Sequence, residues 1–544
     1  MSRTLRRPSL DGGQYDIVVI GGGINGVAIA RECARAGRRT LLVEKHDFAS
    51  GTTSRSTRII HGGLRYLEHG ELGLVRESLR ERERLLRQRP HLVRPKKFLL
   101  ALKPGGRRNA MAIRAGLWLY GALGGKHLQA SARHSAELER LLDSERQLSI
   151  FQYDDAQCEF PERLVAEWLS EAIAAGADAR NHTSAIAIEH ADGRVRGAHL
   201  RDEFSGDESR VAAKWVINAS GPWADRVCES AAIATEQPLI GGVRGSHLVL
   251  RSVPGMPENA VYCEATDGRP VFLIPWNGQH LLGTTEVRDS SDPDRTEPTA
   301  EEIAYLLDSF RNCFPRIRLG AEDIRYAFAG VRPLPHAPGR DAATITRRAI
   351  LHDHADDGVR GMVSIIGGKL TTAAQLARDV ARKVGVRVDD EPLPACAIAP
   401  VDGMEITLRH WSHQVSAMAG ISPMCARRLA EWHGCHALTV ARLAKSADVM
   451  RAPLCAHTDH IVAEAVHAAR YECAVTLGDL LLRRVPVALS GCWSEECSHT
   501  AALHIGRVLG WGPEQMAAEV EEFEAERAMF LRRPATLHLW QHVA

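Results

Sequence analysis

Three glycines near the N-terminus have the spacing of residues that hold a phosphate. Gly21, Gly23 and Gly26 form a Gly-x-Gly-x-x-Gly motif that follows the apolar run Tyr15–Ile20 and opens a helical stretch. The first glycine allows a tight turn, the second lets a pyrophosphate approach the backbone, and the third lets the helix pack on the strand. The N–H groups that begin the helix also stabilise negative charge. The spacing therefore predicts a dinucleotide site.

An acidic residue closes the strand expected after that helix, over Thr40–Glu44. Glu44 lies about 20 residues beyond the glycine turn, where its carboxylate accepts hydrogen bonds from ribose hydroxyls. The same negative charge repels a 2′-phosphate, so the pattern disfavours NADP. NAD and FAD share this fingerprint, and the segment alone leaves both open.

Three later segments favour FAD over NAD. The Ser/Thr/Gly-rich stretch FASGTTSRSTRIIHGGLRYLE offers hydroxyls and backbone donors along an extended cofactor. A strand followed by a glycine turn and a helix recurs in INASGPWA and in SIIGGKLTTAAQ. A helix N-terminus at the second of these suits the electron-rich N1–C2=O side of a reduced isoalloxazine. The predicted contacts to FAD are Gly21, Gly22, Gly23, Gly26, Glu44, Thr53, Ser54, Gly62, Gly221, Gly368, Leu370 and Thr371.

The elements that must position these residues set the fold class. Strand, turn, helix and strand within about 30 residues form a βαβ unit. We predict an α/β FAD-binding Rossmann-like domain, a substrate domain with a mixed or antiparallel β-sheet, and an all-α C-terminal domain after the Pro-rich LPACAIAP. The predicted ranges are 14–75, 155–235 and 345–390 for the FAD-binding domain, 76–154 and 236–344 for the substrate domain, and 395–530 for the helical domain.

Length and composition narrow the class of protein. A chain of 544 residues, 45% hydrophobic and 25% charged, predicts two or three globular domains. The formal net charge of +1 gives no electrostatic basis for nucleic-acid binding. The sequence has no run of about 18 apolar residues and no secretory signal, and its twelve cysteines lack the spacing of a disulfide scaffold. A reducing, cytoplasmic location is therefore expected.

Several short motifs occur in order between about residues 15 and 385. They are IGGGINGVAIA, IHGGLRYLE, NASGPW, RGSHLVL, LIPW with LGTTE, GVRPL and GGKLTT. Together they resemble the FAD-dependent, respiratory, quinone-linked sn-glycerol-3-phosphate dehydrogenases, and the helical tail resembles the C-terminal domain of the longer members. The resemblance implies oxidation of glycerol 3-phosphate at C2 to dihydroxyacetone phosphate, with hydride transfer to FAD and onward electron transfer to quinone. It also implies a D-amino-acid-oxidase-like fold.

The resemblance assigns roles to charged residues within the matched motifs. A phosphomonoester dianion needs two or more cations, and arginine binds it with two parallel hydrogen bonds. Arg65 and Arg332 match the substrate-binding arginines of the family, and Lys369 matches its flavin-side lysine. We expect Arg332 and Lys369 to act both in binding and in catalysis. Abstraction of the C2 hydroxyl proton needs a base, for which His61 is the first choice and His247 the alternative.

Two regions depart from the family pattern and leave the small substrate open. The stretch YDDAQCEFPERL replaces a DDARL-like stretch, and the loop Leu99–Arg133 differs in detail. A related polyol phosphate therefore stays open as the substrate. Two other functions also stay open: a soluble glycerol-3-phosphate oxidase that uses O2, and a flavin-binding, non-catalytic sensor whose helical tail binds a partner.

Two adjacent segments suit contact with a membrane. The arginine-rich Arg76–Lys97 precedes an apolar helix expected at Ala110–Gly125, which carries Trp118 and Tyr120. Such a pair suits peripheral docking on anionic lipid, and the alternative is a charged surface helix beside a core or dimer helix. A position on the inner face of the cytoplasmic membrane and a homodimer both stay open.

Cysteines and histidines recur in the helical tail without the spacing of a zinc site. They are Cys435, His436, Cys455, His457, His460 and Cys473, followed by Cys492 and Cys497. No CxxC or HxxxH pair occurs among them, so we expect reduced core cysteines, surface histidines and no metal.

Overall fold

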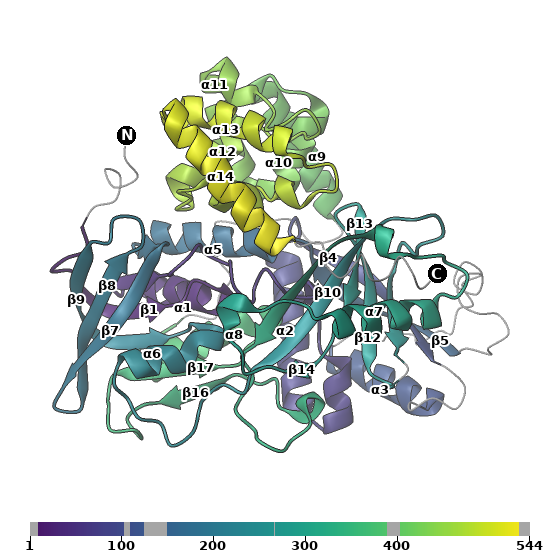
Figure 1. Cartoon of the computed structure of the whole chain (residues 1–544), viewed down its shortest axis with the longest axis horizontal. Helices are drawn as coiled ribbons and strands as arrows, with labels where there is room; N and C mark the ends of the chain where they lie inside the picture. The colour runs from purple at the N-terminus through teal and green to yellow at the C-terminus, as the bar shows by residue number, and fades with distance from the viewer. Residues whose placement is uncertain (1–8, 103–108, 125–148, 266, 389–402, 532–544) are drawn as a thin grey trace.

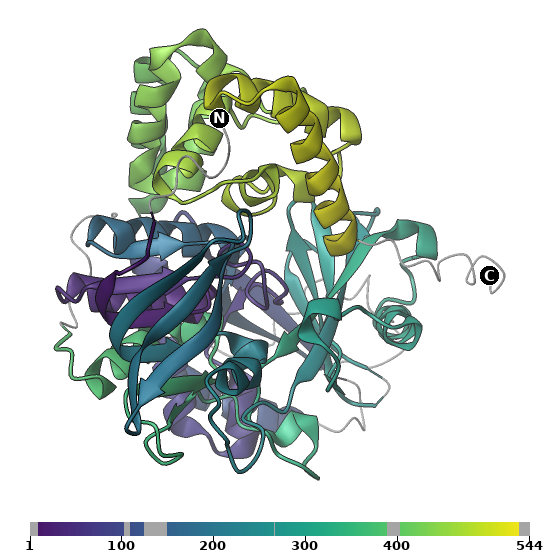
Figure 2. The same ribbon diagram turned by 60° about the vertical axis from the view of Figure 1, so that its left-hand side comes forward.

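The computed structural model describes residues 9–102, 109–124, 149–265, 267–388 and 403–531. Two β-sheets lie side by side with helices around them, and a bundle of helices from the C-terminal part of the chain covers one side of both (Figures 1 and 2). This three-part arrangement confirms the predicted fold class.

The first sheet is mainly parallel and follows the path β16-β17-β9-β1-β2-β6, with β7 and β8 in antiparallel pairing beside β9. β1 pairs in parallel with β2 and β9, and β17 pairs in parallel with β9. The loops after these four strands therefore open at one edge of the sheet, where ligands bind in such folds. The strands are β1 (Gln14–Ile20), β2 (Thr40–Val43), β6 (Asp178–Arg180), β7 (Thr183–Ala191), β8 (Arg194–Asp202), β9 (Glu208–Asn218), β16 (Ile350–Asp353) and β17 (Met362–Ile366).

Helices cover one face of this sheet, and the β7–β8 ribbon with a short helix covers the other. The first face packs on α1 (Ile24–Arg35), α5 (Pro161–Ala174) and α8 (Ala373–Lys383). The second packs on α6 (Ala224–Ser230) and the ribbon. Strands buried on both faces explain the continuous apolar runs in the sequence.

The second sheet is mixed and follows the path β14-β10-β13-β12-β11-β4-β5-β3, with β15 paired to β10. It is antiparallel except where β4 runs parallel to β11, and α7 (Ala300–Cys313) packs on it. Its strands are β3 (Ile59–Ile60), β4 (Val93–Leu102), β5 (Ser149–Cys158), β10 (Val243–Arg251), β11 (Ala260–Glu264), β12 (Pro270–Trp276), β13 (Gln279–Gly283), β14 (Val287–Arg288) and β15 (Ile324–Arg332). Two helices, α2 (Leu72–Gln88) and α3 (Ala110–Leu123), lie beside it.

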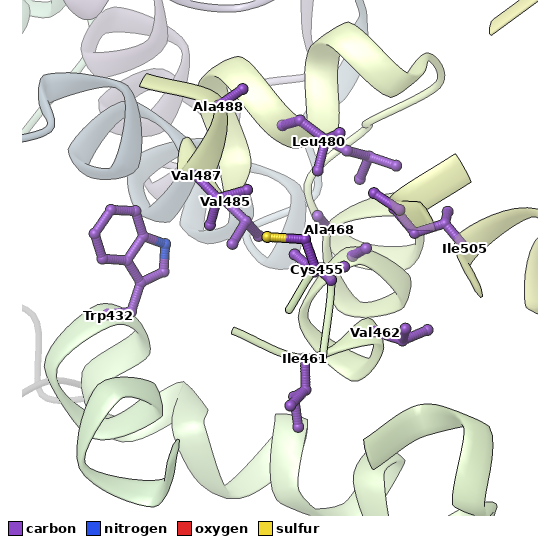
Figure 3. Packing of buried hydrophobic residues seen from close by; sticks show 14 of the residues in the cluster. Trp432, Cys455, Ile461, Val462, Ala468, Leu480, Val485, Val487, Ala488 and Ile505 are labelled. Carbon is purple, nitrogen blue, oxygen red and sulfur yellow. The ribbon is translucent and has the colours of Figure 1, made fainter. Parts of the chain in front are cut away.

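The helical bundle shares one hydrophobic core with the second sheet. Its helices pack around residues such as Cys455, Leu480 and Val485 (Figure 3), and the same cluster includes Trp276 and Phe328 of the sheet. The bundle consists of α9 (Met404–Ala419), α10 (Pro423–His433), α11 (Ala437–Ser446), α12 (Val462–Tyr471), a π-helical turn (Asp479–Arg484), α13 (Glu495–Leu509) and α14 (Pro513–Phe530).

Buried ion pairs attach the bundle to the first sheet. Arg484 makes two 2.8 Å hydrogen bonds to the carboxylate of Asp47, in the loop after β2. Arg163 of α5 pairs with Glu472 of the bundle. Since a buried charge without its partner is strongly unfavourable, these pairs fix where the bundle sits on the loop after β2 and on α5.

Some details differ from the sequence-based expectations. Ile59–Ile60 falls in the range expected for the FAD-binding domain, yet it pairs with β5 of the second sheet. Cys263 of β11 and Cys313 of α7 form a disulfide, which the spacing of the cysteines did not predict. The linker LPACAIAP and parts of the loop Leu99–Arg133 lie outside the described residues. Within the described part of the chain, no helix is long and apolar enough to cross a membrane.

Candidate active site

A cavity of about 1630 Å³ lies where the two sheets and the helical bundle meet. This volume exceeds the ~300–1,000 Å³ of most small-molecule sites, so it has room for a large cofactor together with a small substrate. Its lining includes Glu44 after β2, Arg332 at the end of β15, and Arg483 of the helical bundle. We call the side at the first sheet the cofactor part and the side around Arg332 the arginine part.

The glycine turn brings α1 against the end of β1. Gly23 precedes the first residue of α1, so the N–H groups of the first turn of the helix point toward the cavity. At Gly26 an added Cβ would lie 1.8 Å from the carbonyl oxygen of Gly21, which no side chain allows. The third glycine is therefore required for helix packing, as the motif predicts.

Two side chains hold the cofactor part in shape. Glu44 accepts hydrogen bonds from the backbone N–H groups of Gly22 at 2.6 Å and His46 at 2.9 Å. Thr53 accepts a hydrogen bond from the N–H of Ile24 at 3.1 Å. Each carboxylate oxygen keeps a lone pair for a further donor, so Glu44 can also accept from a ribose hydroxyl.

The residues of the cofactor part fit a dinucleotide that reaches across the sheet edge. The ends of all four parallel strands contribute, through Gly21, Glu44, Gly221 and Gly368. The Oδ1 atom of Asn25 is buried at this surface and has no hydrogen-bond partner among the described residues. An unpaired buried acceptor is unfavourable, so a polar donor of a bound cofactor would satisfy it.

The predicted cofactor contacts fall into two groups. One group lines the cavity: Gly21, Gly23, Glu44, Thr53, Gly221, Gly368 and Leu370. The other group lies behind that lining: Gly22, Gly26, Ser54, Gly62 and Thr371.

The members of the second group make contacts within the protein. The hydroxyl of Ser54 donates to the carbonyl of Ala49 at 2.6 Å, and the N–H of Gly62 donates to the hydroxyl of Tyr120 at 2.8 Å. The hydroxyl of Thr371 accepts from the N–H of His61 at 3.2 Å. These five residues lie behind the lining and shape it, and their contact with the cofactor stays a prediction.

Three arginines surround a single carboxylate in the arginine part. Glu286 accepts from Arg65 at 3.2 Å and Arg347 at 2.6 Å, and Arg332 lies 4.0 Å away. Burial raises the pKa of Glu286, but the charges of Arg65, Arg332 and Arg347 outweigh burial and lower its pKa to about 2. The group therefore carries three positive charges and one negative charge at neutral pH.

Arg332 is held in place by the strand beside it. Its guanidinium donates to the hydroxyl of Thr284 at 3.0 Å and lies against Gly245, where an added Cβ would come within 2.6 Å of Nη2. Burial lowers the pKa of Arg332 to about 10, and Glu286 opposes that effect. The side chain stays protonated at neutral pH and is ready to bind an anion.

Lys369 and Tyr66 line the cavity close to the arginines. The ammonium of Lys369 donates to the hydroxyl of Ser78 at 2.6 Å and lies 4.6 Å from the centre of the Tyr66 ring. Burial lowers the pKa of Lys369 to about 8, while Glu77 and Glu71 act in the opposite direction. The charge of this residue therefore changes just above neutral pH.

Both candidate bases line the same cavity in neutral form. For His61, burial and the charges of Lys369 and Arg65 lower the pKa to about 3. The ring of His61 makes no hydrogen bond to any described residue, so its nitrogens are available to a ligand.

His247 is held more firmly than His61. Its Nε2 lies 2.9 Å from the hydroxyl of Thr57, and its ring stacks on Phe328 with centroids 5.0 Å apart. Burial and the charge of Arg332 lower its pKa to about 3. Its Nδ1 is buried without a partner in the described part of the chain.

The lining residues that sequence reasoning missed include three charged ones, Glu286, Arg347 and Arg483. Glu286 lies in the matched stretch LGTTE, so the motif contained it without revealing its role. Arg347 lies in a stretch with no motif, and Arg483 belongs to the helical bundle. Only the three-dimensional structure brings them to the cavity.

Comparison with known proteins places the chain in a family. The family described as FAD dependent oxidoreductase matches residues 16–381, and the C-terminal domain of alpha-glycerophosphate oxidase matches residues 394–516. The chain is 36% identical to a glycerol-3-phosphate dehydrogenase of Synechocystis over 95% of this chain and 97% of the relative. It is 30% identical to the aerobic glycerol-3-phosphate dehydrogenase of Bacillus subtilis over 86% of both chains.

Solved structures agree with this placement. The glycerol-3-phosphate dehydrogenase from Bacillus halodurans complexed with FAD superposes with a TM-score of 0.76 at 26% identity, covering 96% of each chain. The L-alpha-glycerophosphate oxidase from Mycoplasma pneumoniae with FAD bound has a TM-score of 0.55 at 19% identity. It covers 70% of this chain and 97% of that chain, and it shows the fold alone.

The fold, the cavity and the family match define an FAD-dependent oxidoreductase, so the predicted cofactor is confirmed. Within that class, the chain belongs to the FAD-dependent glycerol-3-phosphate dehydrogenase family, as the sequence motifs predict.

Proposed function

We propose that the protein oxidises sn-glycerol 3-phosphate at C2 to dihydroxyacetone phosphate. The observation that carries the proposal is the cluster of Arg65, Arg332 and Arg347 around Glu286, whose net charge of two positives matches a phosphomonoester dianion. The printed names of the relatives from Synechocystis and Bacillus subtilis support the same substrate. Bound FAD supplies the acceptor for the hydride that leaves C2.

His61 is the base in this proposal, and His247 is the alternative. The free imidazole of His61 faces the cavity, whereas His247 is held between Thr57 and Phe328. Burial and the charges of Lys369 and Arg65 lower the pKa of His61. A bound phosphate dianion offsets those charges and raises that pKa, so the substrate itself makes His61 a better acceptor for the hydroxyl proton.

Quinone is the electron acceptor that we favour. Helix α3 contributes Ile113, Gly116 and Leu119 to the cavity lining and exposes Met111 and Trp118 to solvent. An apolar helix with one face at the cavity and an aromatic residue outside suits a lipid-soluble acceptor reached from a membrane surface. The rival acceptor is O2, as in a soluble oxidase.

Peripheral docking would rest on α3 together with the exposed arginines of α2, which are Arg76, Arg80 and Arg87. Arg82 pairs with Asp155 at 2.6 Å, and Arg89 pairs with Glu167 at 3.2 Å, so these two point into the protein. Flotation with vesicles that contain anionic lipid tests this idea. Replacement of Trp118 by serine should reduce binding, and equal binding would remove α3 from the contact.

Anaerobic titration of the flavin with glycerol 3-phosphate tests the substrate. The flavin absorbance should bleach, and Arg332→Ala should need at least about tenfold more substrate because it loses charged hydrogen bonds to the phosphate. Arg196→Ala, at an exposed arginine beside Asp192, is the control and should behave as the native protein. Equal bleaching by glycerol would contradict phosphate recognition, and no bleaching by any three-carbon phosphate would favour the non-catalytic sensor.

A second assay separates the acceptors. The purified protein with glycerol 3-phosphate should reduce a soluble quinone analogue faster than it consumes O2. Rapid release of one peroxide per substrate would contradict the dehydrogenase assignment and support the oxidase.

A further inference from the structure

A cluster of thiol and imidazole groups lies in the helical bundle and takes no part in lining the cavity. The ligand atoms of Cys455, His457 and Cys497 all lie within 4.8 Å of one another. Nδ1 of His457 is 3.6 Å from Sγ of Cys497. We propose that these three residues, with Cys492 as the fourth ligand, bind one structural Zn²⁺ ion.

The separation of the ligand atoms suits a single tetrahedral ion. With Zn–S near ~2.3 Å and Zn–N near ~2.0 Å, neighbouring ligand atoms of a tetrahedron lie about 3.5–3.8 Å apart. The measured 3.6 Å between His457 and Cys497 falls in that range. Ligands on the two irons of an iron–sulfur cluster lie further apart than this, so the spacing favours one ion over such a cluster.

Cys492 is the nearest further cysteine in sequence to Cys497. It lies in the turn just before α13, outside the group of three whose ligand atoms are all within 4.8 Å of one another, so its exposed side chain would have to move toward them to complete the set. Cys492 and His457 are exposed, while Cys455 and Cys497 are buried. An ion can therefore reach the buried thiols from the solvent side. Three cysteines and one histidine form a Cys₃His set, which is typical of structural zinc.

The two segments that carry the ligands are held in position by other contacts. The N–H of Leu454 donates to the carbonyl of His460 at 2.9 Å and closes the loop around Cys455 and His457. The indole of Trp493 donates to the hydroxyl of Ser498 at 2.9 Å and orients the turn that follows Cys492. The hydroxyl of Ser494 donates to Sγ of Cys497 at 3.4 Å, as outer-sphere groups do around metal-bound thiolates.

Two other groups of potential ligands are occupied by arginines, and in a third group His352 and His354 contact Asp357, with His354 also held by Ser364. Asp47 and Asp479 accept from Arg484 and Arg483, and Glu472 accepts from Arg163. His460, next in sequence to the proposed site, contacts Glu464 at 2.9 Å. In the cluster around Cys455, by contrast, the described contacts join the ligands to one another or to Ser494.

The expectation of no metal rested on sequence spacing, and the spacing of this set is not that of a zinc finger. Cys455 and His457 are separated by one residue, and Cys492 and Cys497 by four. The fold joins the two pairs through the approach of the loop before α12 to the first turn of α13. Zinc there would link two segments of the bundle and take no part in electron transfer, since Zn²⁺ has no redox chemistry.

Metal analysis of the purified full-length protein tests the proposal. Inductively coupled plasma mass spectrometry should find about one zinc ion per chain after gel filtration. Replacement by Co²⁺ should give strong ligand-field bands at wavelengths longer than the flavin absorbance, which indicate tetrahedral thiolate ligands. A metal-free protein that binds neither added Zn²⁺ nor Co²⁺ would overturn the proposal, and so would iron with inorganic sulfide.

The two exposed ligands offer variants that leave the core unchanged. Loss of an outer-sphere partner weakens metal binding about 10–100-fold. His457→Asn and Cys492→Ser each remove a direct ligand, so each should weaken Zn²⁺ binding by more than that. Both should keep their FAD, and their melting temperatures should fall to that of the native protein treated with a chelator. His413→Asn, at an exposed histidine of the same bundle, is the matched control and should keep zinc. Native zinc affinity in both exposed-ligand variants would overturn the assignment.

Discussion

The cofactor part of the cavity is formed mainly by backbone at the ends of four parallel strands, whereas the arginine part is formed by charged side chains. Gly21, Gly221 and Gly368 bring main-chain atoms to the cofactor part. Arg65, Arg332, Arg347 and Glu286 reach the other part from four separate segments. A site formed by backbone loses binding when added side-chain atoms block it, and a site formed by charged side chains loses binding when a charge is removed. Substitutions can test that difference directly.

The largest effect is expected at the third glycine of the turn. Gly26→Val places side-chain atoms where even a Cβ would lie 1.8 Å from the carbonyl oxygen of Gly21. The helix α1 must then move away from the sheet edge, and the protein should be purified without FAD. The measurement is flavin absorbance per polypeptide. Gly73→Ala in α2, where an added Cβ meets only Arg348 at 3.8 Å, is the control. A full complement of FAD in Gly26→Val would refute the close packing.

The next largest effect is expected in the arginine part. Arg347→Ala removes one of the three cations around Glu286 without adding any atom. Charged hydrogen bonds contribute about 1.5–3 kcal/mol, so KM for glycerol 3-phosphate should rise about 10–150-fold. FAD content should not change, since no backbone of the cofactor part is involved. Loss of FAD together with affinity would show that the two parts are not separable.

The same division explains what the sequence predicts well. The determinants of the glycine turn lie within about 30 residues, and β1 and α1 form where the motif places them. Lining residues such as Thr53, Gly221 and Leu370 were found because each belongs to a local pattern of strand, turn and helix. The sequence could not distinguish Ser54 and Thr371, which lie behind the lining, from the lining residues, because it does not tell which way a loop hydroxyl points.

Residues of the arginine part could be predicted only where they lie within a family motif. Arg347 has no local signal, since its partner Glu286 lies 61 positions away. The strands β4 and β5 were missed for a related reason. Lys97 interrupts the apolar pattern of β4, and Asp154 interrupts that of β5, but the two stand opposite each other in the sheet. Cross-strand charge pairs stabilise such strands, and they become visible only when both strands are placed.

The third prediction uses pH to remove one charge reversibly. The pKa of Lys369 is lowered by burial to about 8, so its positive charge is present below that pH and is lost above it. Glycerol 3-phosphate is already a dianion there, because its second phosphate pKa is about 6. The kcat/KM of the free enzyme should therefore fall as pH rises through about 8. Lys369→Arg should remove this decline, because arginine stays charged. An unchanged decline in Lys369→Arg would assign it to another group.

The smallest effect is expected at neighbouring hydroxyls of the cofactor part. Ser54→Ala removes a hydroxyl that donates to Ala49 behind the lining, while Thr53→Ala removes one that faces the cavity and holds the N–H of Ile24. Ser54→Ala should therefore cost about 0.5–1.5 kcal/mol of folding stability and leave the affinity for FAD unchanged. Thr53→Ala should weaken FAD binding more than it lowers the melting temperature. Denaturant unfolding and flavin release measure the two quantities separately. Weaker FAD binding in Ser54→Ala and only a loss of stability in Thr53→Ala would contradict the proposal that Thr53 faces the cofactor and Ser54 supports the lining from behind.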